Sequence, residues 1–325
     1  MTSTRLLGLD IGGTSSRARV VVDGAVVAEA QAASASLSAA GLDSAAAALA
    51  ELLAQLPLDE PFDAVCAGSA GSDLPGAEKF LADRLAPLTR TGTVIVVNDA
   101  MLVLPAAGLD QGVAVICGTG SIAVGTWRGR QALSGGFGYL LGDEGSGYWI
   151  TRAALRALLD RRDRGVPLGA LGETLLASAG ASHIDELQQM FYDFPQPRRW
   201  ARHAPLVLDA DDPAARSIAV EAAQALASLA ASAMRRLVGL AETPDGPPVA
   251  LPVVLGGGLM GHPRLREAAV MAVRGALPGR EVRALTDPPV AGAVRLAGAA
   301  AQRDWVPGDR VPGDRVAGDR VSDAG

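Results

Sequence analysis

Residues 6–30 read LLGLDIGGTSSRARVVVDGAVVAEA, a stretch in which apolar runs are separated by glycine turns. The run Leu6–Asp10 predicts a strand, and the glycine pair after it predicts a tight loop before a second strand at Arg17–Val22. Asp23-Gly24 is typical of a two-residue hairpin, so Ala25–Ala30 is expected to return as a third strand. The chain therefore opens with a three-stranded meander whose first turn is built from glycine.

The same order recurs about a hundred residues later, where residues 113–132 read VAVICGTGSIAVGTWRGRQA. Here Val113–Cys117 predicts a strand, Gly118–Ser121 a loop and Ile122–Trp127 a second strand, followed by a turn and a short third strand near Ala132. Because the order of elements and the composition of the loops both match, we interpret the two segments as an internal structural repeat.

Strands also alternate with helices along the rest of the chain, which predicts an α/β layered fold. Further strands are expected at Phe62–Ala67, Thr93–Val97 and Val253–Leu255. Helices are expected at Ser44–Leu56, Gly76–Leu88, from Ser146 onward, and at Ala215–Leu240, Arg264–Arg274 and Val290–Gln302. The length of 325 residues fits two domains, which we assign to 1–110 and 111–289. The Val-Pro-Gly-Asp-Arg repeats of residues 303–325 predict a disordered tail.

The composition excludes several classes of protein. A net charge of -6 argues against a general function in binding nucleic acid or an anionic membrane. The two cysteines, Cys66 and Cys117, exclude a disulfide scaffold and fit a reducing compartment. Asp10 interrupts the first apolar run, so no signal peptide is expected and the predicted location is cytoplasmic. Lys79 is the single lysine, so a catalytic lysine would have to be this residue.

The first glycine loop is a candidate phosphate site. Gly12 and Gly13 let the backbone approach an anion and present amide hydrogens to it, while Thr14 and Ser15 add hydroxyl groups. Asp10, at the end of the strand, has the chemistry to organise Mg²⁺. Taken alone, this pattern also occurs in ordinary tight turns. The second loop, with Gly118, Thr119 and Gly120, strengthens the interpretation because two such hairpins could grip a triphosphate from both sides.

Two further strand ends carry candidate residues. Asn98 and Asp99 follow a buried strand, where a carboxylate can accept the proton of an attacking hydroxyl. The alternative is that Asp99 is only a helix N-cap. At another strand end, Gly256, Gly257 and Gly258 could let a flat purine lie against the backbone, although a tight turn explains them equally well.

Residues 135–146 read GGFGYLLGDEGS and form the most unusual stretch of the chain. Its small residues leave room for a ligand, Phe137 could offer a face for sugar stacking, and Asp143 could accept hydrogen bonds from sugar hydroxyls. The alternative is a mobile surface loop in which Ser146 caps the next helix. Elsewhere, the cluster Arg198-Arg199-Trp200-Ala201-Arg202-His203 is expected to be a solvated basic patch, although it could touch a phosphate.

Taken in order, these motifs resemble the N-acetylglucosamine kinase branch of the BadF/BadG/BcrA/BcrD ATPase family, within the sugar kinase, Hsp70 and actin superfamily. The resemblance covers about residues 5–302. It implies two ribonuclease H-like lobes, an actin-like ATPase fold, with a cleft for nucleotide and sugar between them. It also implies that the final helix, 290–302, returns to complete the first lobe.

The resemblance assigns roles to the candidate residues. Thr14 and Thr119 would contact the phosphates of ATP, Asp10 would organise Mg²⁺, and Asp99 would be the base for the sugar 6-hydroxyl. Gly257 and its neighbours would hold the adenosine. The residues expected to line the sugar site are Asn98, Asp99, Ser121, Ile122, Gly136, Phe137, Gly138 and Asp143.

One segment departs from the family pattern. Relatives specific for the acetamido sugar often carry an asparagine after the first hairpin, where this chain has Ser34-Ala35-Ser36-Leu37-Ser38. The expected activity is ATP-dependent phosphorylation of N-acetylglucosamine, with glucosamine kinase as the alternative in the same class. A nucleotide-switched regulatory ATPase is the alternative in a different class. The expected partners are the amino sugar, ATP and Mg²⁺, and a homodimer is left open.

Overall fold

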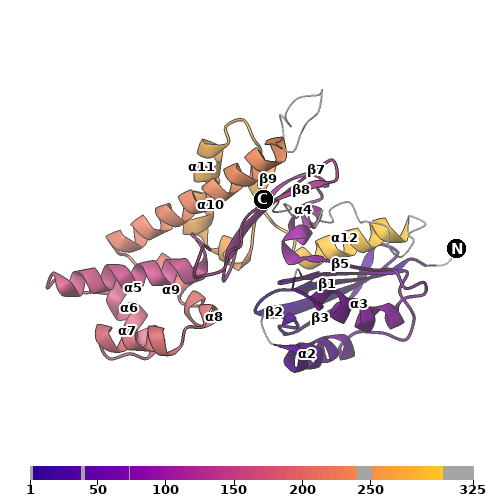
Figure 1. Cartoon of the computed structure of the whole chain (residues 1–325), viewed down its shortest axis with the longest axis horizontal. Helices are drawn as coiled ribbons and strands as arrows, with labels where there is room; N and C mark the ends of the chain where they lie inside the picture. Colours follow the sequence, from indigo (N-terminus) through magenta and orange to yellow (C-terminus); the bar gives the residue numbers. More distant parts are fainter. Residues whose placement is uncertain (1–2, 38–40, 73, 240–250, 303–325) are drawn as a thin grey trace, which may run out of the picture.

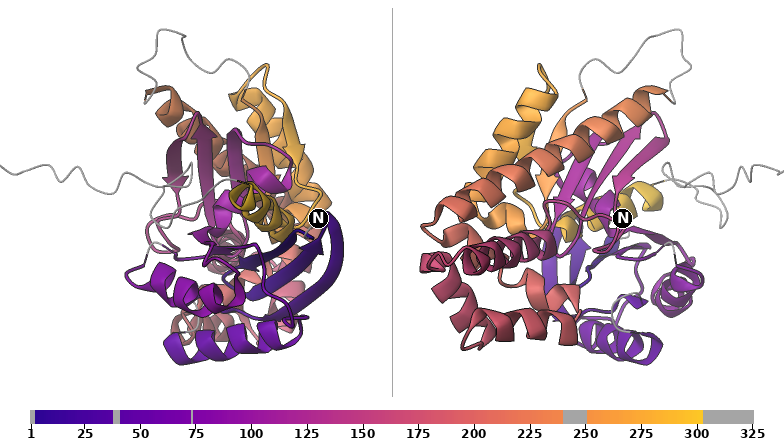
Figure 2. Two further views of the ribbon diagram at one scale, coloured as in Figure 1. Left: turned by 90° about the vertical axis from the view of Figure 1, so that its right-hand side faces the viewer. Right: turned by 60° about the vertical axis from the view of Figure 1, so that its left-hand side comes forward.

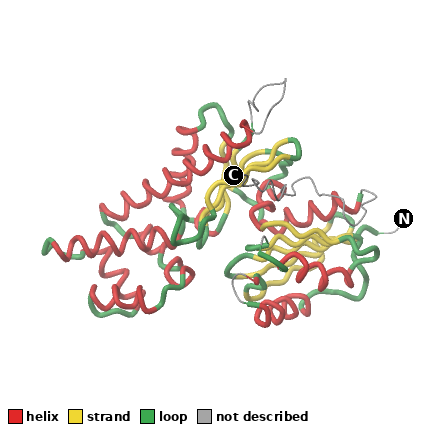
Figure 3. Tube along the Cα trace, in the orientation of Figure 1, coloured by secondary structure: helices red, strands yellow, loops and turns green. Residues whose placement is uncertain are grey.

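The computed structural model describes residues 3–37, 41–72, 74–239 and 251–302. Its strands form two five-stranded sheets, one in each lobe (Figure 3). The first sheet has the order β3-β2-β1-β4-β5, and the second has the order β10-β9-β6-β7-β8. Numbered from its own first strand, each sheet has the same order, 3-2-1-4-5. The predicted repeat and the ribonuclease H-like fold class are therefore confirmed.

The N-terminal sheet begins with the predicted meander. Its strands are β1 (Arg5–Ile11), β2 (Ser15–Val22), β3 (Ala25–Ala33), β4 (Ala64–Ser69) and β5 (Val94–Asn98). The first three are antiparallel, whereas β4 pairs in parallel with both β1 and β5. Asp23 and Gly24 both have positive φ angles, 48° and 83°, as the predicted hairpin turn requires.

Helices cover both faces of this sheet (Figure 1). They are α2 (Leu42–Ala54), α3 (Ala77–Leu85) with the 3-10 turn η1 (Ala86–Leu88), and α12 (Pro289–Ala301). Leu7 and Leu9 of β1 belong to the core shared with α2 and α3, while Leu6 packs toward α12. Gly8 permits the close approach of α12, because a Cβ atom there would lie 2.7 Å from the backbone nitrogen of Val294.

The C-terminal sheet repeats this architecture with more helices (Figure 2). Its strands are β6 (Gly112–Cys117), β7 (Ser121–Trp127), β8 (Arg130–Gly135), β9 (Val253–Gly256) and β10 (Val282–Ala284). Two helices, α10 (Pro213–Gly239) and α11 (Pro263–Ala276), pack together beside it, and α5 (Gly147–Asp163) follows the third strand. By length and composition α10 could cross a membrane, but half of its apolar window is buried inside the fold, as in a core helix.

Residues 164–212 form short helices that the sequence analysis did not predict. They are α6 (Gly169–Ala179), α7 (Ile184–Asp193), α8 (Pro197–Ala201) and α9 (Ala204–Asp209). A separate 3-10 turn, η3 (Gly258–Gly261), follows β9 and contacts α11. Segments of one to three turns carry too few apolar repeats for their periodicity to be read. Other predicted elements shift by a few residues; the tail 303–325 and the expected helix end at Leu240 lie outside the described residues.

A short segment joins the lobes. The 3-10 helix η2 (Asp99–Leu102) and α4 (Val103–Ala106) follow β5, and η2 contacts β1, β4 and β5 of one sheet and β6 and β7 of the other. Leu102 is fully buried between two glycines. A Cβ atom on Gly68 would overlap the Leu102 side chain, and one on Gly292 would overlap the Leu102 carbonyl oxygen. The absence of side chains at these two positions lets η2 pack closely against β4 and α12 within the N-terminal lobe, while η2 also contacts β6 and β7 of the other sheet.

We expect Gly292→Ala to lower the free energy of unfolding by about 1–3 kcal/mol, because the added methyl group overpacks the contact with Leu102. The matched control is Gly275→Ala in α11, where a Cβ atom would meet nothing within 4 Å. The control should be stabilised by about 0.5–1 kcal/mol through its helix preference. Urea unfolding of the three proteins measures both effects; equal stability of the two variants would contradict this account of η2.

Candidate active site

The first glycine loop lies between β1 and β2 and is held by hydrogen bonds within the loop and from the segment that follows β3. The Gly12 amide donates to the Ser15 carbonyl oxygen at 3.1 Å, and the Gly12 carbonyl oxygen accepts a hydrogen bond from Ser34 Oγ at 2.8 Å. Ser36 Oγ donates to the Ala70 carbonyl oxygen at the end of β4. The two serines of the segment that departs from the family pattern are thus buried and support the loop; Ser38 lies outside the described residues.

Asp10 precedes this loop at the end of β1 and is largely buried. Burial raises the pKa of its carboxyl to about 6, and Arg17, its partner in the β1–β2 register, acts in the opposite direction. No residue that the structure describes donates a hydrogen bond to this carboxylate. A desolvated carboxylate without a hydrogen-bond donor is stabilised by a cation, and Mg²⁺ commonly takes only one or two protein carboxylates together with substrate phosphates. Asp10 therefore fits a magnesium ligand.

The second glycine loop is joined to the start of α5. The Gly118 carbonyl oxygen accepts from the Gly147 amide at 2.8 Å, and the Thr119 carbonyl oxygen accepts from the Tyr148 amide at 3.4 Å. Within the loop, the Gly118 amide donates to the Gly120 carbonyl oxygen at 2.9 Å. These bonds fix the loop relative to the helix that follows the Gly-rich stretch 135–146.

Asp143 lies directly on this second loop. Its Oδ1 accepts from the Ser121 amide at 3.3 Å, and a Cβ atom on Gly120 would lie 2.8 Å from its Oδ2. Burial raises the pKa of the Asp143 carboxyl above its ordinary value, the Ser121 amide lowers it, and the charge of Glu144 raises it. Asp143 has a φ of 62°, an uncommon conformation for a residue other than glycine. Backbone geometry therefore holds a carboxylate beside the predicted phosphate loop.

The third group of glycines, residues 256–258, forms a tight turn after β9 that requires glycine. Gly257 follows β9 with a φ of 95°, and a Cβ atom there would overlap the Cys117 carbonyl oxygen and lie 2.7 Å from the Cys117 nitrogen. Gly256 pairs with Ile116 in the parallel register of β9 and β6, and Gly258 begins η3. The bare backbone of 256–258 therefore lies next to the strand end from which the second glycine loop begins.

Asn98 and Asp99 lie at the lobe junction. Asn98 Oδ1 accepts from the Ala100 amide at 3.1 Å and occupies the N-cap position of η2, so the cap that the sequence suggested for Asp99 belongs to Asn98. Asp99 Oδ1 also accepts from the Ala100 amide, at 3.0 Å, and its side chain is half-buried. Asp99 is thus the first residue of a short helix that contacts β6 and β7, the strands that the second glycine loop connects.

The stretch 135–146 divides into a packed part and an exposed part. The Gly136 amide donates to the Ser121 carbonyl oxygen at 3.1 Å, and a Cβ atom on Gly136 would lie 2.8 Å from Ile122 Cδ1. Beyond it, the turn at Gly138 carries Phe137, whose side chain is 69% exposed. The structure thus brings Ser121, Ile122, Gly136 and Asp143 together but leaves Phe137 facing solvent.

Exposed apolar side chains continue along this turn, where Leu140 and Leu141 are 76% and 83% exposed. The alternative role of Ser146 is confirmed, because its Oγ accepts from the Trp149 amide at 3.2 Å as the N-cap of α5. The same segment therefore caps a helix and holds Asp143 in place.

The basic cluster near residue 200 is not the solvated patch that was expected. Trp200 is 1% exposed and His203 is buried, so both belong to the core of the C-terminal lobe. Arg198 extends from α8 toward the other lobe, and its Nη2 lies 3.4 Å from the Cβ position of Gly13. In the sequence, the tryptophan and the histidine within this arginine-rich segment indicate that one face of the segment is buried.

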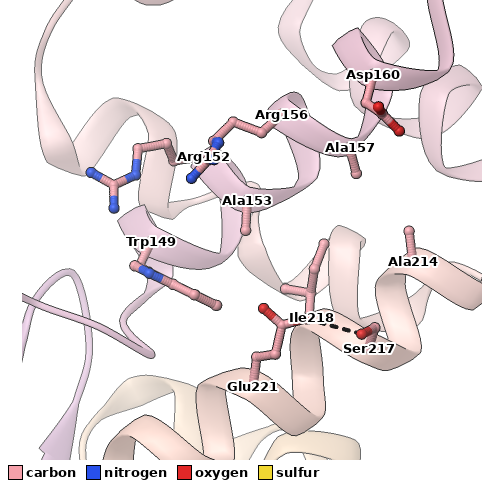
Figure 4. Close-up of a pocket in the computed structure, with 10 residues that line it drawn as sticks. All are labelled: Trp149, Arg152, Ala153, Arg156, Ala157, Asp160, Ala214, Ser217, Ile218 and Glu221. Carbon is pink, nitrogen blue, oxygen red and sulfur yellow. Dashed lines mark hydrogen bonds between the residues drawn. The ribbon is translucent and has the colours of Figure 1, made fainter. Parts of the chain in front are cut away.

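A separate pocket of about 570 Å³ lies between α5 and α10 (Figure 4). Trp149, Arg152 and Arg156 reach it from α5, and Glu221 reaches it from α10, where its carboxylate accepts from Ser217 Oγ at 2.9 Å. None of the predicted site residues lines this pocket, so it is distinct from the glycine loops.

Comparison with known proteins identifies the class. Residues 7–301 match the BadF/BadG/BcrA/BcrD ATPase family, so the chain belongs to this family. A putative N-acetylglucosamine kinase from Chromobacterium violaceum has a similar structure, with a TM-score of 0.68 and 27% identity, covering 90% of this chain and 98% of that one. A second putative N-acetylglucosamine kinase structure, from Porphyromonas gingivalis, shares the fold with a TM-score of 0.68 at 21% identity, covering 91% of this chain and 98% of that one.

Two curated relatives match part of the chain. The N-acetylmuramic acid/N-acetylglucosamine kinase of Clostridium acetobutylicum is 44% identical over 108 residues, which cover 32% of this chain and 35% of the relative. The N-acetyl-D-glucosamine kinase of Dictyostelium discoideum is 37% identical over 149 residues, which cover 43% and 46%. The matched segments therefore span less than half the length of either curated relative.

We expect Asp10→Asn to be more stable than the natural protein, by about 3 kcal/mol at pH 8, from about 1.4 kcal/mol for each pKa unit. The folded protein raises this pKa above the unfolded value of 3.8, so ionisation costs stability, and the cost grows as the pH rises from about 4 to 6. Urea unfolding at pH 5 and pH 8 measures the difference. A difference that did not grow with pH would show that Asp10 is not desolvated.

Proposed function

We propose that this chain is an ATP-dependent hexosamine kinase that phosphorylates the 6-hydroxyl of N-acetylglucosamine. One observation carries the proposal: Asp99 lies on η2, where both sheets meet, in a member of this ATPase family. The two curated relatives are named as kinases of acetylated amino sugars, which supports a sugar as the phosphate acceptor.

In this mechanism the nucleotide lies between the two glycine loops. The residues that bind its phosphates are Gly12, Gly13, Thr14, Ser15, Gly118, Thr119 and Gly120, and those that hold the adenosine are Gly256, Gly257 and Gly258. Mg²⁺, held by Asp10, would neutralise charge on the phosphates when bound. The amides of Gly12 and Gly118 already donate within their own loops, so the remaining amides of the two loops would donate to the phosphates, which the bare glycine backbone allows to come close.

The sugar lies between η2 and the stretch 135–146. Asn98, Ser121, Ile122, Gly136, Phe137, Gly138 and Asp143 surround it, and Asp99 accepts the proton of the 6-hydroxyl as that oxygen attacks the γ-phosphorus. The 69% exposed ring of Phe137 would then cover the sugar only after the lobes move together. Such a closure would exclude water and suppress hydrolysis of ATP.

The lobe boundaries complete the proposal. We assign residues 1–110 and the returning helix 290–302 to the N-terminal lobe and residues 111–289 to the C-terminal lobe, with a cytoplasmic location and the option of a homodimer.

Glucosamine kinase is the alternative within the class, favoured by the serines that replace the expected asparagine in the segment 34–38. A nucleotide-switched regulator is the alternative outside it.

The direct test measures ADP release from Mg·ATP with N-acetylglucosamine, glucosamine, N-acetylmuramic acid, glucose or no sugar. We expect N-acetylglucosamine to stimulate release most strongly, because a kinase that excludes water turns over only with its acceptor. Stronger stimulation by glucosamine would select the alternative substrate. Equal and slow release in every reaction would contradict the kinase and support the regulator.

Asp99→Asn should lower the rate of sugar phosphorylation by about 10²–10⁴-fold, the usual contribution of a general base. The matched control is Asp83→Asn on the exposed face of α3, where the carboxylate pairs only with Lys79 among the described residues. Steady-state kinetics with saturating sugar compares the two variants. Near-normal turnover by Asp99→Asn would overturn the assignment of the base.

A further inference from the structure

The single lysine of the chain lies away from the glycine loops. Lys79 is on α3, its side chain is 79% exposed, and its Nζ pairs with the Asp83 carboxylate at 2.8 Å. The transferred phosphoryl group nevertheless develops negative charge that enzymes of this kind neutralise with metal ions and cationic side chains. A cationic side chain that reaches the phosphates would therefore not be a lysine.

Arg198 is the arginine that the structure places against the first glycine loop. Its Nη2 and Nε lie 3.4 Å and 3.9 Å from the Cβ position of Gly13, so the lack of a side chain at Gly13 leaves the guanidinium next to the loop backbone. Burial lowers the pKa of the guanidinium below its ordinary value. Among the residues that the structure describes, none accepts a hydrogen bond from Arg198 or pairs with its charge.

An unpaired, half-buried guanidinium is an unfavourable arrangement for folding alone. Removing a charge from water costs free energy that a nearby anion or acceptor normally offsets. The planar guanidinium presents parallel donors that match the oxygen atoms of a phosphate. The neighbouring loop has the bare backbone typical of phosphate sites, so the missing partner of Arg198 fits a phosphoryl group.

The short helix α8 holds Arg198 in a defined position. Trp200, two residues later, is buried; its Nε1 donates to the Phe194 carbonyl oxygen at 2.8 Å, and its own carbonyl oxygen accepts from Thr151 Oγ1 at 2.9 Å. The same hydroxyl contacts the Gly147 carbonyl oxygen at 3.1 Å. Because Gly147 is bonded to the second glycine loop, α8 is fixed relative to that loop.

Arg198 therefore links the two lobes at their phosphate loops. It is anchored with the second loop in the C-terminal lobe and reaches the first loop in the N-terminal lobe, and Figure 1 shows α8 on the side of its lobe that faces the N-terminal sheet. A group bound between the loops would contact the guanidinium from one side and the Gly13 backbone from the other.

We propose that Arg198 binds the γ-phosphoryl group of ATP and stabilises its negative charge during transfer, an inference that rests on the proposed kinase function. In that step the bond between the γ-phosphorus and the β,γ-bridging oxygen breaks as the sugar oxygen bonds to the phosphorus. The hydroxyl proton passes to Asp99, ADP leaves with the bridging oxygen, and Arg198 keeps its protons throughout.

The test compares Arg198→Gln with Arg199→Gln, which removes the same charge from the same helix. Arg199 is a matched control because its guanidinium stacks 4.2 Å from the centre of the Phe194 ring, and it is not one of the residues assigned to the nucleotide or the sugar. Binding of ADP and of the β,γ-imido analogue of ATP is measured for each protein, together with kcat for sugar phosphorylation.

For Arg198→Gln we expect kcat to fall by about 10²–10³-fold. Affinity for the imido analogue should fall about tenfold or more while affinity for ADP stays within about twofold, because ADP lacks the γ-phosphoryl group. Arg198→Lys should recover only part of the loss, since an ammonium lacks the planar fork. Arg199→Gln should behave like the natural protein in all three measurements.

Equal loss of affinity for ADP and for the imido analogue would overturn the proposal, as would unchanged kcat and binding in Arg198→Gln. Circular dichroism of each variant and the retained ADP affinity exclude unfolding as the cause of any loss. The binding measurements test the contact between Arg198 and the phosphate independently of the kinase assignment. If no sugar stimulates the natural protein but Arg198 still distinguishes the imido analogue from ADP, the phosphate contact stands and the kinase proposal fails.

Discussion

The packing of Leu102 between Gly68 and Gly292 is the contact on which the rest of the site depends. It fixes η2 tightly against β4 and α12, and the same short helix contacts β6 and β7 of the other sheet. Asp99 begins this short helix, so its position is set by backbone contacts and not by a flexible loop. Because protein interiors are packed densely, a single methyl group added at such a crossing would displace the groups that pack around it.

Around this junction the fold brings together two charged side chains that make no hydrogen bond with the described residues. Asp10 is a buried carboxylate at the end of β1, and Arg198 is a half-buried guanidinium beside the loop that follows it. Each is unfavourable alone, and a magnesium-bound polyphosphate would complement both. Desolvated charges of this kind are common at functional sites, where a bound ligand supplies the missing hydrogen bonds.

Much of this organisation could be predicted from the sequence. The strand-loop-strand repeat and Asp23-Gly24 are local signals, and they led to both sheets and to the glycine loops. The approach of Arg198 to Gly13 depends on a contact between distant segments, which the periodicity of the sequence does not reveal. The cap at Asn98 is local, but the neighbouring Asp99 is equally suited to capping, so residue type alone did not assign it. The exposed side chain of Phe137 likewise depends on how the lobes are placed, so its proposed contact with sugar remains a prediction.

The most direct test of the central claim is the position of the phosphate on the product. The protein would be incubated with Mg·ATP and N-acetylglucosamine, and the purified product examined by two-dimensional proton–phosphorus NMR. Attack by the 6-hydroxyl, with Asp99 at the junction as its base, predicts coupling of phosphorus to the two protons on carbon 6. Phosphate on another carbon, or inorganic phosphate alone, would contradict the account.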